Sequence, residues 1–149
     1  MKKKIISIPP VYFLVSLVTL FLLHFLVPGM NRIPFPFTLC GIPFLFSGIF
    51  FIFGAHRSLT LSATPVNFAR STSLIKDGLY RRSRNPMYLG FVLFLLGLSL
   101  WSGNVLALVC PVFMFLILDR MFIPYEEEKM TGTFGKEYLE YKQLVRRWL

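Results

Sequence analysis

The stretch MYLGFVLFLLGLSLWSGNVLALVCPVFMFLILDRMFI, residues 87–123, decides the fold of this chain. It holds two apolar runs, Met87–Trp101 and Val105–Ile123, separated only by Ser-Gly-Asn at 102–104. That tripeptide is typical of a turn, so the runs predict two helices joined as a tight antiparallel hairpin. A bilayer core about 30 Å thick is crossed by roughly 17–25 apolar helical residues, so we expect two membrane spans here, the first of them short.

Two further apolar runs, Val11–Val27 and Phe37–Ala55, precede the hairpin and extend the pattern to four spans. The composition agrees, because 55% of the 149 residues are hydrophobic and only 15% are charged, against about 25% charged in an average soluble domain. The 17 Phe, 6 Tyr and 2 Trp exceed what a water-soluble core of this size could hide. We therefore predict one all-α membrane domain over residues 1–149, with about four transmembrane helices and no Rossmann domain. A soluble enzyme, a disordered tail and a disulfide scaffold are disfavoured.

The positions of the basic residues predict the orientation of the spans. Of the 16 Lys and Arg residues, 15 fall on one side of a four-span arrangement, and Arg32 alone falls on the other. By the positive-inside rule that side is cytoplasmic. We therefore expect both termini, the loop 56–86 and the tail 124–149 on the cytoplasmic side of the cell membrane. The basic start also resembles a secretory signal. The first run is longer than a signal core and lacks a cleavage site after it, so we expect a retained span.

Two polar stretches on the predicted cytoplasmic side are the candidates for chemistry, and the first also has a structural interpretation. In the loop, Asn85-Pro86 is typical of a helix start, with Asn capping free amides and Pro at the first helical position. The neighbouring arginines suit anionic headgroups, and the neighbouring tyrosines suit a membrane interface. Taken by themselves, these residues are therefore better explained by membrane structure than by a binding site.

The second stretch follows the fourth span and begins with three glutamates, 126–128. Such a run is most often solvated, but beside an anionic membrane surface it favours a specific partner. Asp119-Arg120, just before it, is either a functional pair at membrane depth or the end of the helix, with Arg120 reaching outward. Further along, apolar residues at helical spacing predict one amphipathic tail helix, lying on the membrane or over the loop. These residues are Met130, Phe134, Tyr138, Tyr141 and Val145.

Two motifs lie on either side of the hairpin, and together they identify a family resemblance. Residues 78–90 match G-x-Y-x-x-x-R-[HN]-P-x-Y-x-G, and residues 126–141 match E-E-x6-F-G-x-x-Y-x-x-Y. These patterns resemble the isoprenylcysteine carboxyl methyltransferase and phospholipid methyltransferase superfamily, over about half of the chain. The resemblance implies a small integral membrane enzyme that uses S-adenosylmethionine. No Gly-rich dinucleotide loop, Walker motif, HExxH, Gly-x-Ser-x-Gly or Cys/His metal spacing occurs in the sequence.

The resemblance also implies where the cofactor binds, between the loop before the hairpin and the C-terminal segment. The Arg-Asn-Pro element and Tyr88 are then expected against the methionine portion, with free amides at the helix start for its carboxylate. Glu126 and Glu127 are expected to accept hydrogen bonds from the ribose hydroxyls or the amino group, and Tyr80 and Tyr138 to pack the adenine or close the site. The expected cofactor-binding residues are Tyr80, Arg84, Asn85, Pro86, Tyr88, Gly90, Glu126, Glu127 and Tyr138, and no metal is expected.

Three residues, Asn85, Glu127 and Arg120, are expected to act in catalysis. Asn85 stands where the prenylcysteine enzymes usually have His, and Asn cannot serve as a general base near neutral pH. A carboxylate acceptor needs no base, whereas an amine has to bind deprotonated, so Asn85 fits either acceptor without deciding between them. Our prediction is carboxyl O-methylation rather than phospholipid N-methylation. Arg120 is expected to hold a carboxylate or phosphate on a lipophilic acceptor that enters from the bilayer. Three other arginines are alternatives for this role: Arg81, Arg82 and Arg146.

Two other functions stay open at this point. A sterol-reductase-like NADPH enzyme shares a comparable Arg-[His/Asn]-Pro-x-Tyr element, although paired glutamates suit hydroxyls and cations better than a 2′-phosphate. A non-catalytic membrane protein could instead use the basic loop to hold anionic lipid and the tail helix to bind a partner protein. No nucleic-acid partner is expected, because membrane topology accounts for most of the net charge of +9.

Overall fold

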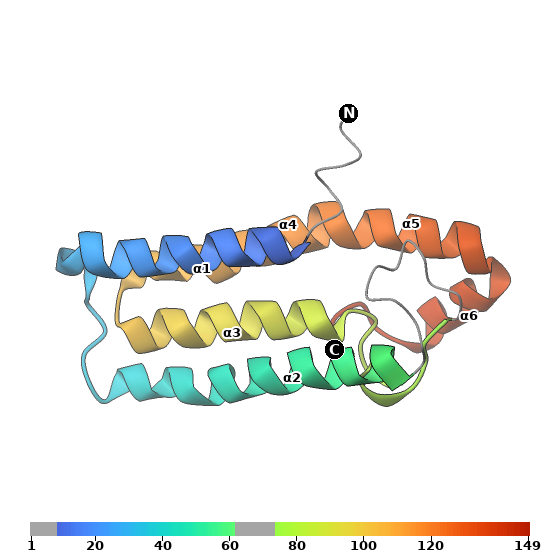
Figure 1. Ribbon diagram of the computed structural model, residues 1–149, viewed down its shortest axis with the longest axis horizontal. Coiled ribbons are helices and arrows are strands. Elements are labelled where there is room, and N and C mark those ends of the chain that lie inside the picture. The colour runs from blue at the N-terminus through green and yellow to red at the C-terminus, as the bar shows by residue number, and fades with distance from the viewer. Residues whose placement is uncertain (1–8, 62–73) are drawn as a thin grey trace.

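The computed structural model describes residues 9–61 and 74–149 as an all-helical bundle (Figure 1). Its first two apolar helices are α1, Pro9–Leu26, and α2, Gly41–Leu61, which follows the short helix η3, Phe37–Cys40. A second short helix, η5, Gly78–Arg81, leads into α3, Pro86–Ser102. Part of the predicted topology rests on Lys2, Lys3, Lys4 and Arg70, which lie outside the described residues.

One long helix follows the turn after α3 and runs from Val105 to Phe134. It consists of four consecutive segments: η6, Val105–Leu108; α4, Val109–Ile117; the π-helical η7, Leu118–Phe122; and α5, Ile123–Phe134. Three helices are long and apolar enough to cross a membrane, namely Pro9–Leu26, Phe37–Leu61 and Val105–Phe134, and α3 is a shorter apolar helix of 17 residues. The predicted class, an all-α membrane protein, is therefore confirmed, and the described residues contain no β-strand.

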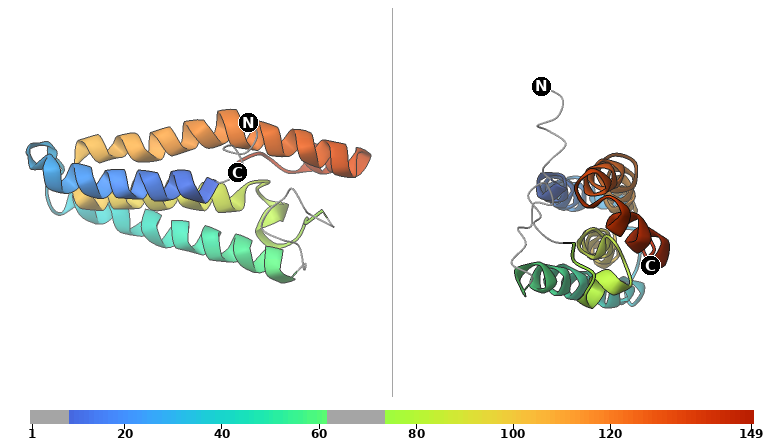
Figure 2. Two further views of the ribbon diagram at one scale, coloured as in Figure 1. Left: turned by 45° about the horizontal axis from the view of Figure 1, so that its top comes forward. Right: turned by 90° about the vertical axis from the view of Figure 1, so that its right-hand side faces the viewer.

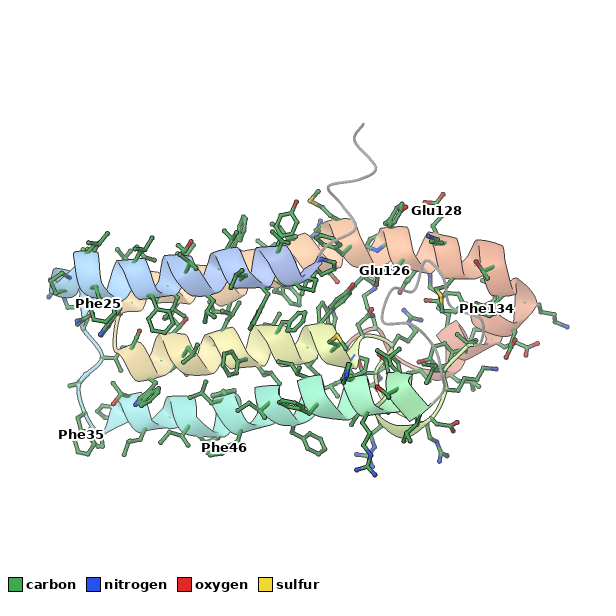
Figure 3. The ribbon with its side chains drawn as sticks, viewed as in Figure 1. Phe25, Phe35, Phe46, Glu126, Glu128 and Phe134 are labelled. Atoms are coloured by element: carbon green, nitrogen blue, oxygen red, sulfur yellow. The ribbon has the colours of Figure 1, made fainter. Side chains whose placement is uncertain are left out.

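Helix α3 lies at the centre of the bundle. It contacts α2 on one side and α4 on another, and α1 packs beside α3 and α4 (Figure 2, right). The largest core cluster joins α3 to the long helix, with Leu95, Met114 and Leu118 fully buried. Many phenylalanines on α1 and α2 instead face outward, as Phe25 and Phe46 do in Figure 3. Outward phenylalanines of this kind suit a lipid environment.

Four glycines allow α2 and α3 to approach closely. A Cβ atom added at Gly90 would lie 2.9 Å from the carbonyl oxygen of Gly48, and one added at Gly97 would lie 2.8 Å from that of Gly41. Small residues at membrane helix interfaces let the two backbones approach each other in this way. Gly90 therefore has a structural role against α2, whatever it contributes to a cofactor site.

We expect the substitution Gly97→Val to destabilise the protein by about 1–3 kcal/mol or more, because the added side chain would overpack the α2–α3 contact. A Cβ there already lies 2.6 Å from the backbone nitrogen of Leu45. The matched control is Gly132→Ala on α5, where a Cβ meets nothing within 4 Å. This control is expected to stabilise by about 0.5–1 kcal/mol through helix propensity. Unfolding of the detergent-solubilised variants by SDS titration measures both, and equal stabilities would contradict the close approach.

The predicted hairpin turn is confirmed, and Asn104 in it also contacts the end of α1. Gly103 ends α3 with φ of 71°, a left-handed conformation that glycine adopts readily. Asn104 is fully buried, and its Nδ2 donates to the carbonyl oxygens of Leu23 and Val27, each at 3.1 Å. These carbonyls lie at the end of α1 and also accept from the backbone nitrogens of Val27 and Met30, so Asn104 adds a second hydrogen bond to each. The turn therefore also fixes the end of the first helix.

The tail differs from the single amphipathic helix that the spacing predicts. The helix that contains the fourth predicted span continues past Ile123 to Phe134. The chain then bends at Gly135, with φ 52° and ψ −122°, before α6, Lys136–Leu144. The expected apolar face nevertheless forms one buried cluster, because the bend folds α6 back on α5. Its members are Met130, Tyr138, Tyr141 and Val145, with Leu74 and Phe134 packed against them.

The helix that contains the second predicted span also extends beyond the predicted end of that span. Helix α2 continues to Leu61 rather than ending at Ala55, so the first part of the expected loop 56–86 is helical.

Candidate active site

The loop before α3 and the C-terminal segment lie side by side at one end of the bundle, where the C-terminus lies next to the start of α3 (Figure 1). The backbone nitrogen of Arg84 donates to the carbonyl oxygen of Arg146 at 3.0 Å, and Nδ2 of Asn85 donates to that of Arg147 at 3.0 Å. Ser83 is fully buried between them and forms an isolated bridge with Arg146. The two motifs are thus brought together through backbone hydrogen bonds.

Glu127 is the centre of an ion-pair network. Its Oε1 accepts from the Arg84 guanidinium at 2.8 Å, and its Oε2 lies 2.8 Å from Nζ of Lys142 and 3.4 Å from Nη2 of Arg147. The side chains of Glu127 and Arg84 are 7% and 8% exposed, so this pair is largely removed from water. Because Arg84 precedes α3 and Lys142 lies on α6, one carboxylate connects α5 to both neighbouring segments and to the C-terminal segment.

Glu126 differs from Glu127, because only one of its two carboxylate oxygens has a hydrogen-bond partner in the described residues. It is half-buried, and Tyr88 on α3 donates its hydroxyl to Oε1. No hydrogen bond or ion pair to Oε2 is found among the described residues. Figure 3 shows Glu126 on the side of α5 that faces α3, whereas the exposed Glu128 points outward. Of the three adjacent glutamates, Glu126 is therefore the one that is partly buried toward α3 and still has an oxygen without a partner in the described residues.

Three buried tyrosines surround these carboxylates. The hydroxyl of Tyr141 donates to the carbonyl oxygen of Tyr80 at 2.7 Å, which fixes α6 on η5. The hydroxyl of Tyr80 is itself buried without a hydrogen-bond partner in the described residues. Burial, with Tyr141 and Glu126 nearby, raises the pKa of Tyr80. Burial and then the charge of Glu127 raise the pKa of Tyr138 to about 12. Both phenols consequently stay protonated near neutral pH and can donate hydrogen bonds.

The start of α3 only partly follows the expected capping pattern. Pro86 is the first helical residue, as predicted, and it is fully buried. Asn85 precedes it, but its side chain makes no capping hydrogen bond, because Nδ2 donates to Arg147 instead. The expectation that Asn85 caps the free amides is therefore wrong. A tertiary partner takes the side chain, which leaves the first amides of α3 without that cap.

Eight of the expected cofactor-binding residues are gathered at this end of the bundle. They are Tyr80, Arg84, Asn85, Pro86, Tyr88, Glu126, Glu127 and Tyr138. Two expected site residues lie apart from them. Gly90 faces α2, and the side chain of Arg120 is 79% exposed, with Asp119 as its ion-pair partner at 3.6 Å.

Four residues that sequence reasoning did not assign to the site belong to its surroundings. Lys142 and Arg147 share Glu127, and Asp119 and Trp148 pair with each other across the chain: Nε1 of Trp148 donates to Oδ1 of Asp119 at 3.0 Å. Burial lowers the pKa of Arg147, but the carboxylates of Glu127 and Asp119 outweigh it and raise that pKa above its usual value. The signals in the sequence were the charge of Asp119 inside an apolar run and the closing Val-Arg-Arg-Trp, residues 145–148, which follows the second motif.

The fold and this cluster define a multi-pass helical membrane protein whose polar site joins a helical hairpin to the C-terminal segment. Residues 37–137 match the phospholipid methyltransferase family, and the chain belongs to that family.

The curated relatives agree with this assignment. An uncharacterized protein of Haemophilus influenzae is 44% identical over 63 residues, covering 42% of this chain and 100% of that protein. Protein-S-isoprenylcysteine O-methyltransferase A of Arabidopsis thaliana is 33% identical over 97 residues, 63% of this chain and 47% of its own length. Protein-S-isoprenylcysteine O-methyltransferase of Saccharomyces cerevisiae is 40% identical over 75 residues, 48% of this chain and 30% of its own. The chain thus spans half or less of these two named enzymes. No solved structure matches it.

Proposed function

We propose that this chain is an integral membrane methyltransferase that transfers a methyl group from S-adenosylmethionine to a lipophilic acceptor at the cytoplasmic membrane face. Family membership and the names of the relatives support methyl transfer. The observation that carries the proposal is a set of unsatisfied polar groups in one place. These are Oε2 of Glu126, the buried hydroxyl of Tyr80 and the buried Nε of Arg84. Buried polar groups in native proteins are nearly always hydrogen-bonded, so the Tyr80 hydroxyl and Nε of Arg84, together with the unpaired oxygen of Glu126, support the binding of a polar ligand here.

These groups fit the polar parts of S-adenosylmethionine. Glu126 would accept hydrogen bonds from its amino group or ribose hydroxyls, and its negative charge suits a ligand with a positive sulfur and an ammonium group. Nε of Arg84 and the uncapped amides at the start of α3 would donate to its carboxylate. Tyr80 and Tyr138 would border the adenosine. When bound, the cofactor supplies a methyl group that its sulfonium activates for transfer.

Glu127 acts on the site through the cations that it holds. Both of its oxygens are engaged by Arg84, Lys142 and Arg147 in the structure. We therefore assign Glu127 to fixing the position of Arg84, while a direct contact between Glu127 and the cofactor stays a prediction. Asn85 orients the Arg84 backbone in the same way, through the hydrogen bond to Arg147.

Carboxyl O-methylation remains our preferred reaction over phospholipid N-methylation. A carboxylate oxygen is nucleophilic without a base, and aligning it with the activated methyl group in a dry site supplies most of the needed acceleration. Asn85 stands in the motif and supplies no base, His24 lies near the far end of α1, and His56 is exposed on α2. The basic residues of the loop and tail support, under the positive-inside rule, a cytoplasmic position for both termini and for the site.

Purified protein in detergent tests the proposal. Isothermal titration with S-adenosylmethionine is expected to show binding, and NADPH is expected to show none. Incubation with methyl-labelled cofactor and a lipid extract of the native membrane is then expected to give a labelled lipid or lipid-like acid. Binding of NADPH alone would favour a reductase instead. Lipid affinity that falls steeply with salt and ignores both cofactors would indicate a non-catalytic lipid-binding protein.

We predict that Arg120→Ala lowers acceptor turnover about tenfold and leaves the affinity for S-adenosylmethionine unchanged. Among the residues that the structure describes, the exposed guanidinium pairs with Asp119 alone, at 3.6 Å, so it is available to pair with an anionic group on an acceptor at the interface. The matched control is Arg32→Ala, an exposed arginine in the connection between α1 and α2 that has no expected role in the site. Labelled methyl transfer at saturating cofactor measures the effect. Normal turnover by Arg120→Ala would show that another group holds the acceptor.

A further inference from the structure

The charged residue Asp119 lies in an unusual part of the long helix. It falls within the π-helical segment η7, between the buried residues Leu118 and Phe122. Single π-helical turns inside α-helices are rare and are often found at functional sites. An ionised carboxylate among apolar neighbours is costly unless it is paired. The carboxylate of Asp119 therefore depends on the groups that pair with it.

Apart from the neighbouring Arg120, at 3.6 Å from Oδ2, the partners of Asp119 come from the C-terminal segment, residues 145–148. Oδ1 of Asp119 accepts from Nε1 of Trp148 at 3.0 Å and from Nη1 of Arg147 at 3.3 Å. The indole of Trp148 also packs on Phe115, one turn earlier on the long helix, with ring centroids 5.0 Å apart. The C-terminal segment is therefore held to this helix by a charged contact and by an aromatic contact.

The same segment holds the loop before α3 through its backbone. The carbonyl oxygen of Arg146 accepts from the Arg84 nitrogen, and that of Arg147 accepts from Nδ2 of Asn85. Arg147 thus contacts Asp119 with its side chain and Asn85 with its carbonyl group. Because backbone carbonyls make these contacts, they depend on where the C-terminal segment lies rather than on its side chains. A shift of the segment would therefore change the positions of Arg84 and Asn85.

We propose that Asp119 is a positioning residue that anchors the C-terminal segment 145–148 on the long helix and thereby sets Arg84 and Asn85 for cofactor binding. The inference rests on the proposed function, because it takes S-adenosylmethionine as the ligand of that site. Asp119 itself touches neither the loop nor Glu126 in the described contacts, so its effect passes through Arg147 and Trp148. Loss of the anchor weakens cofactor binding more than it slows the step that follows binding.

The fluorescence of Trp148 tests the anchor without any ligand. In a Trp101→Phe background Trp148 is the sole tryptophan of the chain, since the sequence has only two. Asp119→Ala is expected to raise acrylamide quenching of Trp148 severalfold and to shift its emission to longer wavelength. Asp119→Asn, which keeps an oxygen for the indole, is expected to restore most of the protection. Asp77→Ala, at an exposed aspartate in the loop, is the matched control and should leave quenching unchanged.

Binding and turnover of the same variants test the positioning role. We expect Asp119→Ala to raise KM and Kd for S-adenosylmethionine about tenfold, the effect of losing one charge-assisted hydrogen bond, with kcat within about twofold of the parent. Asp119→Asn is expected to recover part of that loss. Unchanged quenching would overturn the anchor. Increased quenching with an unchanged Kd would overturn the positioning role, because the contact would then be structural only. A parent protein that binds no S-adenosylmethionine would contradict the proposed function, and the positioning role with it, while the quenching result still judges the anchor.

Discussion

Replacing Glu127 with alanine is expected to lower the free energy of unfolding by about 3–5 kcal/mol and to abolish cofactor binding. Removing one partner of a buried ion pair costs about this much, because the other charge is left uncompensated. Here the stranded group is the Arg84 guanidinium, whose side chain is 8% exposed. Lys142 is 42% exposed and can turn toward water, so it adds less to the loss. SDS titration of the detergent-solubilised protein measures the change in stability, and isothermal titration measures binding.

The adjacent residue supplies the control for this prediction. Glu128 is exposed and points away from the site, so Glu128→Ala is expected to change the free energy of unfolding by no more than about 0.5 kcal/mol. A double variant, Glu127→Leu with Arg84→Met, removes both buried charges and is expected to regain much of the stability without regaining cofactor binding. If Glu127→Ala proved as stable as Glu128→Ala, Arg84 would not depend on this carboxylate.

The architecture could be predicted because its main signals are local in the sequence. Long apolar runs specify the helices, and Ser-Gly-Asn specifies the hairpin turn, where Gly103 adopts a positive φ. The approach of α2 to α3 has no comparable signal. A glycine at position 90 or 97 looks like a weak helical residue until the backbone of Gly48 or Gly41 is placed against it.

The site shows the same division between local and tertiary information. The motifs identify Arg84, Asn85, Glu126 and Glu127 as a group, but they do not distinguish the two glutamates. That distinction arises only from packing, because α6 brings Lys142 to Glu127 while Glu126 turns toward Tyr88 on α3. The local rule for Asn before a helical Pro likewise fails, since a carbonyl 62 positions away takes the Asn85 side chain. Three basic residues that the sequence alone connects only with topology or a motif, Arg84, Lys142 and Arg147, are partners of Glu127 in an ion-pair network.

Replacing Glu126 with glutamine is expected to weaken the binding of S-adenosylmethionine by roughly 10–100-fold, which corresponds to one or two charge-assisted hydrogen bonds. The glutamine has nearly the same size, and its oxygen can still accept the Tyr88 hydroxyl, so the arrangement of α3 and α5 is kept. Only the negative charge toward the ligand is lost. Isothermal titration with S-adenosylmethionine gives the change in affinity, and labelled methyl transfer gives the change in turnover.

The stability of the Glu126→Gln variant separates this prediction from that for Glu127. Glu126 is half-buried and has no ion-pair partner among the described residues, so removing its charge is expected to leave the free energy of unfolding unchanged or slightly higher. Tyr88→Phe is the second comparison: it removes the hydroxyl that orients Glu126 but keeps the charge, and a severalfold loss of affinity is expected. Wild-type affinity in Glu126→Gln would mean that its free oxygen does not face the cofactor. A loss of both stability and affinity would instead assign Glu126 to the same structural network as Glu127, and the ligand-binding carboxylate would have to be sought elsewhere.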